Sequence, residues 1–192
     1  HGKTAVLALA EVLPCEGEGT ASLNAGELIR RALDEGLREI VLGTAESAIR
    51  DCGMGCMRAL GVKFYDAEGT ELKGSAEELR RVAAVDTEYL HPGLREARIT
   101  ILNGGISETP AEYAEDAVRF RALVASAVGV SASDCAGVGG LLCALGGARR
   151  ASGVDALLDA VDFDKLLQGV ALVVTGEMLL EEASFSGGRA VP

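Results

Sequence analysis

The residues best placed to do chemistry follow an apolar run and combine one carboxylate with two glycines. In VLGTAESAIRDCGMGCMRALG, residues 41–61, the apolar run ends at Gly43, and Asp51 then precedes Gly53 and Gly55. Glycines permit a tight turn, which is one explanation of the pattern. The same turn would let bare backbone N–H groups approach a phosphorylated or carboxylated ligand. The stretch therefore predicts either a plain turn or one wall of an anion site.

Two other polar stretches follow strand-like segments in the same way. NGGISETP, residues 103–110, comes directly after ITIL, and TGE, residues 175–177, comes directly after ALVV. In parallel α/β sheets, ligands collect beyond the carboxyl ends of the strands, so three such ends favour a ligand site. Glycines that serve only close packing remain the alternative, because many α/β proteins have such strand ends.

The elements that must hold these residues alternate between strand and helix. Asn24 with Glu27 and Ser75 with Glu78 match the capping-box pattern of a helix start. The apolar segment at 4–13 fits a short strand or a buried helix, since periodicity alone does not separate the two. Strands are otherwise predicted near 38–43, 62–66, 97–103 and 170–177, and helices near 25–35, 53–60, 78–85, 109–129 and 135–147, with two short helices within 153–169. This order predicts an α/β fold with a mostly parallel sheet flanked by helices on both faces.

The composition indicates which classes of partner and which cellular compartment fit the chain. The formal net charge of -11 argues against nucleic acid and against an anionic membrane surface as partners. No apolar run approaches the roughly 20 residues that span a bilayer, and no secretory signal pattern opens the chain. The five scattered cysteines are typical of reduced thiols in a cytoplasmic protein. Because the histidines are only His1 and His91, no zinc site is expected.

The length of 192 residues allows one sizeable core or two small ones. We expect residues 1–192 to form one α/β region, with the alternative that 1–20 and 171–192 belong to a second, incomplete domain. The chain begins at His1 and ends in GGRAVP, so it is expected to be a processed, cut or tagged product.

Three blocks of the sequence resemble characteristic blocks of the bacterial glycerate kinases of the type-1 family. The blocks are TASLNAGELIRRALDEG (20–36), REIVLGTAESAIRDCGMGCMRALGVKFYDAEG (38–69) and AGVGGLLCALGGARRASGVDALLDAVDFDKLLQGVALVVTGE (136–177). The resemblance is colinear over most of the chain. It implies the middle and C-terminal part of a glycerate kinase-like fold, with a family segment expected ahead of residue 1 but absent here.

The resemblance also implies roles for single residues. It implies Asp51 and Glu177 as catalytic residues, Asp51 as a base, an orienting group or a magnesium ligand. The implied substrate- or phosphate-binding residues are Ser22, Ser47, Arg50, Gly53, Gly137, Gly139, Gly140, Thr175, Gly176 and Arg189. The implied cofactors are ATP and Mg²⁺, with the magnesium arriving on the nucleotide near Asp51 rather than in a protein metal motif.

Each of these roles has a structural alternative. Asp51 could cap the following helix, and Glu177 could be an exposed loop carboxylate. Ser22 and Ser47 could cap turns, and the glycines near 137–140 could serve close helix packing.

The resemblance is incomplete at the polar positions. Arg50 stands where the family has asparagine, Glu46 replaces a glycine, and Met178 and Ala183 interrupt the block after TGE. Arg50 could clamp a carboxylate or could mark a site that no longer works.

Two functions follow as hypotheses. The chain leans toward an enzyme, a glycerate kinase that phosphorylates D-glycerate with ATP, its partners being glycerate and nucleotide. The alternative is a non-catalytic homologue that binds a ligand or a protein partner. The oligomeric state and the glycerate carbon that is phosphorylated stay open. A dinucleotide-binding module is not expected, because no G-x-G-x-x-G lies between a strand and a helix.

Overall fold

A four-stranded parallel sheet forms the centre of the molecule. The computed structural model describes residues 3–9, 22–44, 49–103 and 114–174. Each neighbouring pair in the sheet is parallel, in the order β1 (Thr4–Ala8), β2 (Glu39–Thr44), β5 (Arg98–Asn103), β6 (Arg149–Ser152). The carboxyl ends of the strands therefore share one edge of the sheet. The predicted strands at 38–43 and 97–103 are confirmed, and the segment at 4–13 begins as a strand.

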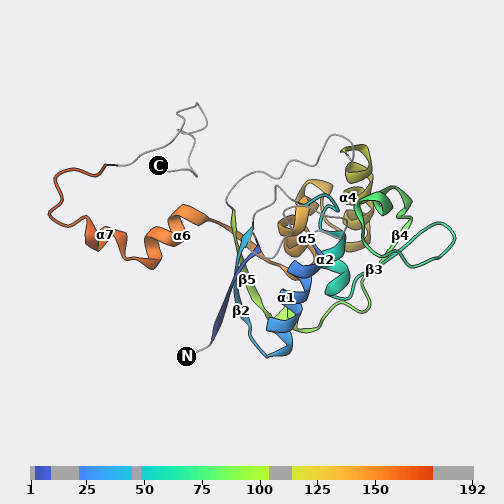
Figure 1. Ribbon diagram of the computed structural model, residues 1–192, viewed down its shortest axis with the longest axis horizontal. Helices are drawn as coiled ribbons and strands as arrows, with labels where there is room; N and C mark the ends of the chain where they lie inside the picture. The colour runs from blue at the N-terminus through green and yellow to red at the C-terminus, as the bar shows by residue number, and fades with distance from the viewer. Residues whose placement is uncertain (1–2, 10–21, 45–48, 104–113, 175–192) are drawn as a thin grey trace.

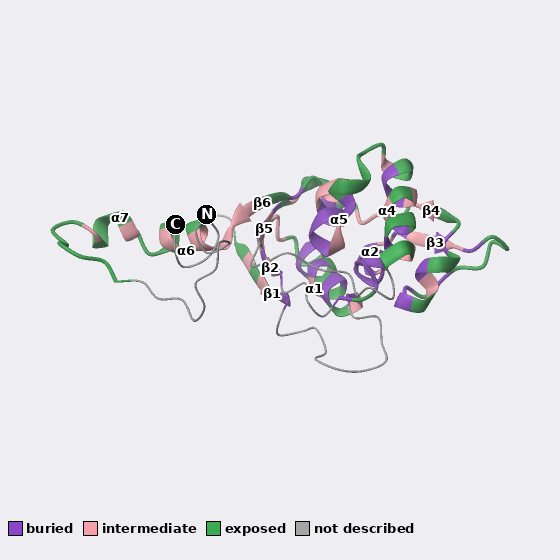
Figure 2. Cartoon of the chain, turned by 90° about the horizontal axis from the view of Figure 1, so that it is seen from above, coloured by how far each residue is buried: buried purple, intermediate pink, exposed green. Residues whose placement is uncertain are grey.

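Four helices lie on one side of this sheet. They are α1 (Leu23–Asp34) and α5 (Gly137–Gly146), which lie next to the strands, and α2 (Met54–Ala59) and α4 (Ala114–Val128), which lie farther out (Figures 1 and 2). The strand side chains on that face, among them Ile40, Leu42, Ile99 and Ile101, are buried. On the other face Val6 is 75% exposed. The predicted mostly parallel sheet flanked by helices is confirmed. Both faces were expected to be covered, and among the described residues the packed helices lie on one side only.

The helix α1 begins at Leu23, one residue before the predicted capping box. Its N-cap is Ser22, so Asn24 and Glu27 lie inside the helix and the capping-box prediction is wrong. The end of the helix is close to the prediction, because α1 stops at Asp34 and Gly36 follows with φ of 79°. The residue that ends a helix in the left-handed backbone conformation is usually glycine. Gly36 therefore marked the end of α1 correctly in the sequence.

A small antiparallel unit follows α2. Strands β3 (Lys63–Tyr65) and β4 (Ala84–Asp86) pair with each other, and the 3₁₀ helix η3 (Ala76–Arg81) lies between them. The capping box of Ser75 and Glu78 is confirmed, although the helix stops at Arg81 because the next residues turn into β4. The rings of Phe64 and Phe120 lie 5.5 Å apart and join this unit to α4.

The second half of the chain adds the short α3 (Gly93–Glu96), η5 (Ala132–Cys135) and the last sheet strand. The predicted helix at 109–129 is confirmed from Ala114 onward, and its first residues lie outside the described ranges. Strand β6 was not predicted. It has four residues at the edge of the sheet, and Arg149 and Arg150 are exposed, so no apolar pattern marks it.

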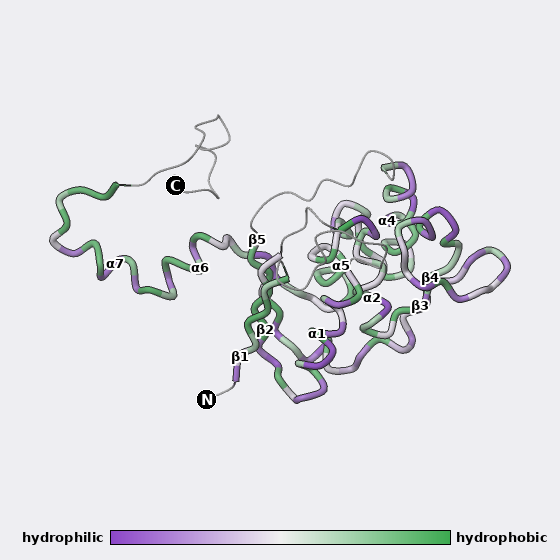
Figure 3. Tube along the Cα trace, in the orientation of Figure 1, coloured by the Kyte–Doolittle hydropathy of each residue, from purple (hydrophilic) through white to green (hydrophobic). Residues whose placement is uncertain are grey.

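Two short helices, α6 (Gly153–Ala160) and α7 (Phe163–Leu166), extend away from the sheet on the side opposite the other helices (Figures 1 and 2). Their prediction is confirmed, but neither has a buried residue. The predicted buried strand at 170–177 is wrong over 170–174, which form no strand and are exposed. Figure 3 shows the hydrophobic character of much of this segment.

Within the described ranges, no helix combines the length and the apolar character that crossing a bilayer requires.

Candidate functional site

The glycine turn predicted from the sequence lies between the end of β2 and the start of α2. Cys52 has φ of 53° and Gly53 has φ of 86°, so two consecutive residues adopt the left-handed conformation. Such a conformation is strained for cysteine, and strain of this kind is tolerated only where the surroundings enforce it. The turn, which we call the elbow (residues 49–55), therefore has a shape that its neighbours hold in place.

The carboxylate of Asp51 organises the elbow. Its Oδ1 accepts a hydrogen bond from the backbone N–H of Gly53 at 3.0 Å, and its Oδ2 accepts one from the N–H of Gly55 at 3.1 Å. The residue is only 1% exposed. These are the contacts of a helix cap, so the capping alternative for Asp51 is the one whose hydrogen bonds are present.

Ser22 extends the same network to a second helix. Its hydroxyl group donates to Asp51 Oδ2 at 2.6 Å and accepts from the backbone N–H of Cys56 at 2.8 Å. Its own backbone N–H also points to Asp51 Oδ2, at 3.4 Å. Ser22 is fully buried. The serine at the start of α1 and the first turn of α2 are therefore joined through one carboxylate.

Burial sets the acid–base character of this network. Burial raises the pKa of Asp51, while hydrogen bonds from Ser22, Gly53 and Gly55 act in the opposite direction. Burial also raises the pKa of the Cys56 thiol, and the nearby charge of Asp51 adds to that effect. A thiol with a raised pKa is a poor nucleophile, so Cys56 serves packing.

Small residues let four segments meet at the elbow. A Cβ on Gly26 of α1 would lie 2.7 Å from the Cα of Cys56. A Cβ on Gly53 would lie 3.1 Å from the backbone of Val138, at the start of α5. A Cβ on Gly74, whose φ is 90°, would lie 3.2 Å from the Cα of Gly55. The sequence did not single out Gly26 or Gly74, because a glycine inside a helix or a loop does not reveal what it packs against.

The glycines of α5 differ in their surroundings. A Cβ on Gly140 would lie 2.6 Å from the carbonyl oxygen of Asp134, so Gly140 serves close packing against η5. Gly139 is buried as well. Gly137 opens the helix with φ of 61°, beside the elbow. The first N–H groups of a helix have no acceptor within it, so the start of α5 keeps anion-binding capacity.

Arg50 is the exposed residue near the start of the elbow. It is exposed, while the preceding Ile49 and the following Asp51 are buried. The pKa of Glu77 is lowered by hydrogen bonds from its own backbone N–H and from Ser75, and the positive charge of Arg50 contributes further. Arg50 and the η3 segment are therefore electrostatically close, and the guanidinium remains accessible to an anion.

Five predicted site residues lie outside the described ranges: Ser47, Thr175, Gly176, Glu177 and Arg189. Their predicted roles stay predictions, including the catalytic role of Glu177. The structure brings together Ser22, Asp51, Gly53 and the start of α5, which come from three separate parts of the sequence.

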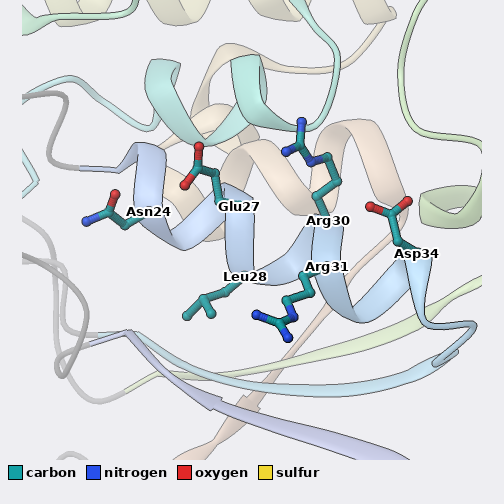
Figure 4. Close-up of a pocket in the computed structure, with 6 residues that line it drawn as sticks. All are labelled: Asn24, Glu27, Leu28, Arg30, Arg31 and Asp34. Atoms are coloured by element: carbon teal, nitrogen blue, oxygen red, sulfur yellow. The ribbon is translucent and has the colours of Figure 1, made fainter.

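Two hollows of the described surface are lined by no residue of the elbow. One runs along α1 and is lined by Asn24, Glu27, Leu28, Arg30, Arg31 and Asp34 (Figure 4). All six residues come from a single helix and carry charges of both signs, so this hollow has no converging set of ligand-binding groups. Among the described residues, no group of three or more histidine, cysteine, aspartate or glutamate side chains could hold a metal ion.

Comparison with known proteins places the chain among relatives about twice its length. The glycerate kinase family model matches residues 8–104 and 103–191. The glycerate kinase of Neisseria meningitidis serogroup B is 32% identical over 186 residues, which cover 84% of this chain and 50% of the relative. The glycerate 2-kinase of Escherichia coli K12 is 28% identical, and the match covers 97% of this chain and 58% of the relative.

A solved structure of a similarly described protein has a similar fold. A crystal structure described as glycerate kinase 2 from Salmonella typhimurium LT2 superposes with a TM-score of 0.70 at 25% identity. The superposition covers 87% of this chain and 54% of the Salmonella chain. The chain thus spans about half the length of the proteins it matches. Sequence and fold agree, and the chain belongs to the glycerate kinase family.

Proposed function

We propose that this chain is part of a glycerate kinase that transfers the terminal phosphoryl group of ATP to D-glycerate. The observation that carries the proposal is the family match, which runs from residue 8 to residue 191 and therefore includes the elbow. Phosphoryl transfer depends mainly on positioning and on neutralising charge, with a base near the attacking hydroxyl group. The residues around the elbow are suited to the first two tasks.

The anionic groups of the substrates would meet two kinds of donor. The start of α5 offers first-turn N–H groups at Gly137 and its neighbours, where the helix dipole also favours negative charge. Arg50 offers an exposed guanidinium, whose fork of N–H groups matches a carboxylate or a phosphate. We assign to Arg50 the carboxylate of glycerate and to α5 a phosphate group.

Asp51 has a different part in this proposal. Both of its oxygens are engaged by N–H and O–H donors, and the side chain is 1% exposed. Direct coordination of Mg²⁺ by Asp51 does not fit that arrangement, because a cation would meet the same oxygens that the donors already occupy. Asp51, which the family resemblance implied as a base, would instead hold the elbow in place, and we assign the role of base to Glu177, the other carboxylate predicted to be catalytic. ATP, when bound, supplies the phosphoryl group together with its own Mg²⁺.

The same burial is also compatible with a second candidate function, which the comparisons do not favour. A carboxylate that is fully used inside the protein, next to an arginine where the family pattern has asparagine, is compatible with a homologue that binds a ligand without turning it over. In that case Arg50 and α5 would still bind an anion, and no product would form.

An assay of ADP release with glycerate, ATP and Mg²⁺ tests the first proposal. We expect turnover above background, and we expect Arg50→Gln to weaken the response to glycerate by on the order of 10- to 100-fold, the loss of one charge-assisted interaction. Arg31→Gln is the matched control, because Arg31 is exposed on α1 and pairs only with Glu35 in the described contacts.

Calorimetry separates the two candidates. Binding of glycerate or ATP without ADP release would support the non-catalytic homologue and overturn the kinase proposal for this chain. Turnover that Arg50→Gln leaves unchanged would keep the kinase and remove Arg50 from its substrate site.

A further inference from the structure

A short turn of the antiparallel unit packs against the elbow. Gly74 is buried, and a Cβ on it would lie 3.2 Å from the Cα and 3.3 Å from the backbone nitrogen of Gly55. The two glycine backbones therefore pack directly on each other. The N–H of Gly55 donates to Asp51 Oδ2 at 3.1 Å. Residues 73–75, which we call the 73–75 turn, thus contact a peptide group that binds the Asp51 carboxylate.

The Glu78 carboxylate fixes this turn from the side of η3. Its Oε2 accepts the N–H of Ser75 at 3.1 Å, which completes the capping box at the start of η3. The same oxygen accepts the N–H of Gly74 at 2.7 Å. A capping box needs only the bond to Ser75, so the shorter bond to Gly74 fixes the turn and not the helix.

A second side chain holds the same turn from the side of α2. Nη1 of Arg58 donates to the carbonyl oxygen of Lys73 at 2.9 Å. Arg58 lies in the last turn of α2, the helix whose start belongs to the elbow. The 73–75 turn is therefore joined both to η3 and to the helix on which it packs.

The elbow in turn carries one of the groups that we propose to bind substrate and contacts the other. Arg50 is exposed and is joined to the buried Asp51 by one peptide bond. A Cβ on Gly53 would lie 3.1 Å from the backbone nitrogen of Val138, in the first turn of α5. A shift of the elbow would therefore move the Arg50 guanidinium relative to the start of α5.

We propose that Glu78 is a positioning residue for the anion site of this chain. Glu78 fixes the 73–75 turn, the turn holds Gly55 where it binds Asp51, and the elbow held in this way keeps Arg50 beside the start of α5. Glu78 itself does not touch the substrate. The action of Glu78 on the elbow is independent of any ligand, whereas its consequence for glycerate rests on the proposed function.

Amide hydrogen exchange of the folded 192-residue chain tests the first step without a ligand. The measured quantity is the exchange rate of Gly55 divided by that of Ile101, which lies in a strand paired on both sides. Global unfolding exposes both amides, so a higher ratio marks local opening of the elbow. We expect Glu78→Ala to raise the ratio on the order of 3- to 10-fold, the effect of losing about one hydrogen bond.

Two further variants make this test specific. Glu78→Gln keeps an acceptor at the same place, because glutamine also serves in a capping box, and it should restore the wild-type ratio. Glu68→Ala is the matched control, since Glu68 is exposed in the turn after β3 of the same unit. An unchanged ratio in Glu78→Ala would show that Glu78 only caps η3 and would overturn the proposal. A ratio that Glu78→Gln does not restore would also overturn it, because the hydrogen bonds would then not hold the turn.

Steady-state kinetics with glycerate, ATP and Mg²⁺ test the second step. We expect Glu78→Ala to raise the KM for glycerate on the order of 3- to 10-fold and to change kcat less, because a misplaced Arg50 binds the substrate carboxylate less well. Glu78→Gln and Glu68→Ala should keep the wild-type KM. An unchanged KM in Glu78→Ala would overturn the action of Glu78 on Arg50. Absence of turnover in the wild-type chain would instead overturn the proposed kinase activity, and the exchange ratio would still decide whether Glu78 positions the elbow.

Discussion

At the scale of single residues, one buried carboxylate and one buried hydroxyl group supply acceptors to N–H groups at the start of α2. The Asp51 oxygens accept the N–H groups of Gly53 and Gly55, and the Ser22 hydroxyl group accepts that of Cys56. The first N–H groups of any helix need such acceptors, and a buried N–H without one is costly. These hydrogen bonds lie within the protein, so they stabilise the elbow independently of any ligand.

Removing the Ser22 hydroxyl group should therefore destabilise the fold. Ser22→Ala leaves Asp51 Oδ2 with one donor fewer and leaves the N–H of Cys56 without its acceptor. We expect a loss of about 1–3 kcal/mol in the free energy of unfolding, measured by urea titration. Ser133→Ala is the control, because the Ser133 hydroxyl group is exposed and contacts Ser131 at the surface. Equal stabilities of the two variants would show that the buried network contributes little.

The ion pair of Asp66 predicts a pH dependence of stability. The N–H of Thr70 lowers the pKa of Asp66 most, and the guanidinium of Arg81, 2.6 Å from Oδ2, lowers it further. Because the folded-state pKa lies below the ordinary value of 3.8, the stabilisation is present above that pH and is lost as the pH falls through the folded-state pKa.

The variant Asp66→Asn tests this sign. We expect a lower melting temperature than wild type at pH 7, with the difference shrinking as the pH falls below 3.8. Glu115→Gln, at an exposed position of α4, should show no such convergence. A difference between Asp66→Asn and wild type that stays constant down to pH 2 would contradict the assignment.

At the scale of elements, the contact between α1 and α2 depends on a glycine that the sequence does not explain. A Cβ on Gly26 would lie 2.7 Å from Cys56 Cα and 2.8 Å from the Cβ of Ala59. Real Cβ atoms do not approach this closely, so the two helices would have to separate. Their separation would also lengthen the hydrogen bond between Ser22 and Cys56, because both contacts join the same two helices.

Gly26→Ala should accordingly destabilise the protein despite the better helix propensity of alanine. We expect a cost of roughly 1–3 kcal/mol from overpacking, measured by thermal or urea unfolding. Gly43→Ala is the control, since the nearest atom to its added methyl group is 3.9 Å away. An unchanged or higher stability of Gly26→Ala would mean that α1 and α2 adjust without strain.

The accuracy of the predicted elements depended on how local each signal is. The end of α1 was located well because a left-handed glycine, Gly36, follows it. Its start was misplaced because Asn24 and Glu27 have the spacing of a capping box. The N-cap is instead Ser22, whose hydroxyl group accepts a hydrogen bond from Cys56 of α2. The run at 170–174 has the composition of a buried strand, but a strand also has to pair with a neighbour, and these residues pair with none of the described strands.

At the scale of the whole molecule, the described chain spans about half the length of the relatives that it matches. Within that span the helices α1, α2, α4 and α5 lie on one side of the sheet, and residues 153–174 extend away from its other side (Figures 1 and 2). The two helices of that segment have no buried residue, whereas the other side of the sheet carries the buried core.

The sequence by itself determined the α/β class, the order of the main elements and the family. These properties depend on apolar periodicity, glycine positions and motif spacing, all of which are local to the chain. Only the tertiary structure decided that the Asp51 carboxylate is enclosed by Ser22, Gly53 and Gly55, because its partners lie up to 29 positions away. It alone also decided which face of the sheet is covered, since burial depends on what packs against a strand and not on the strand's own residues.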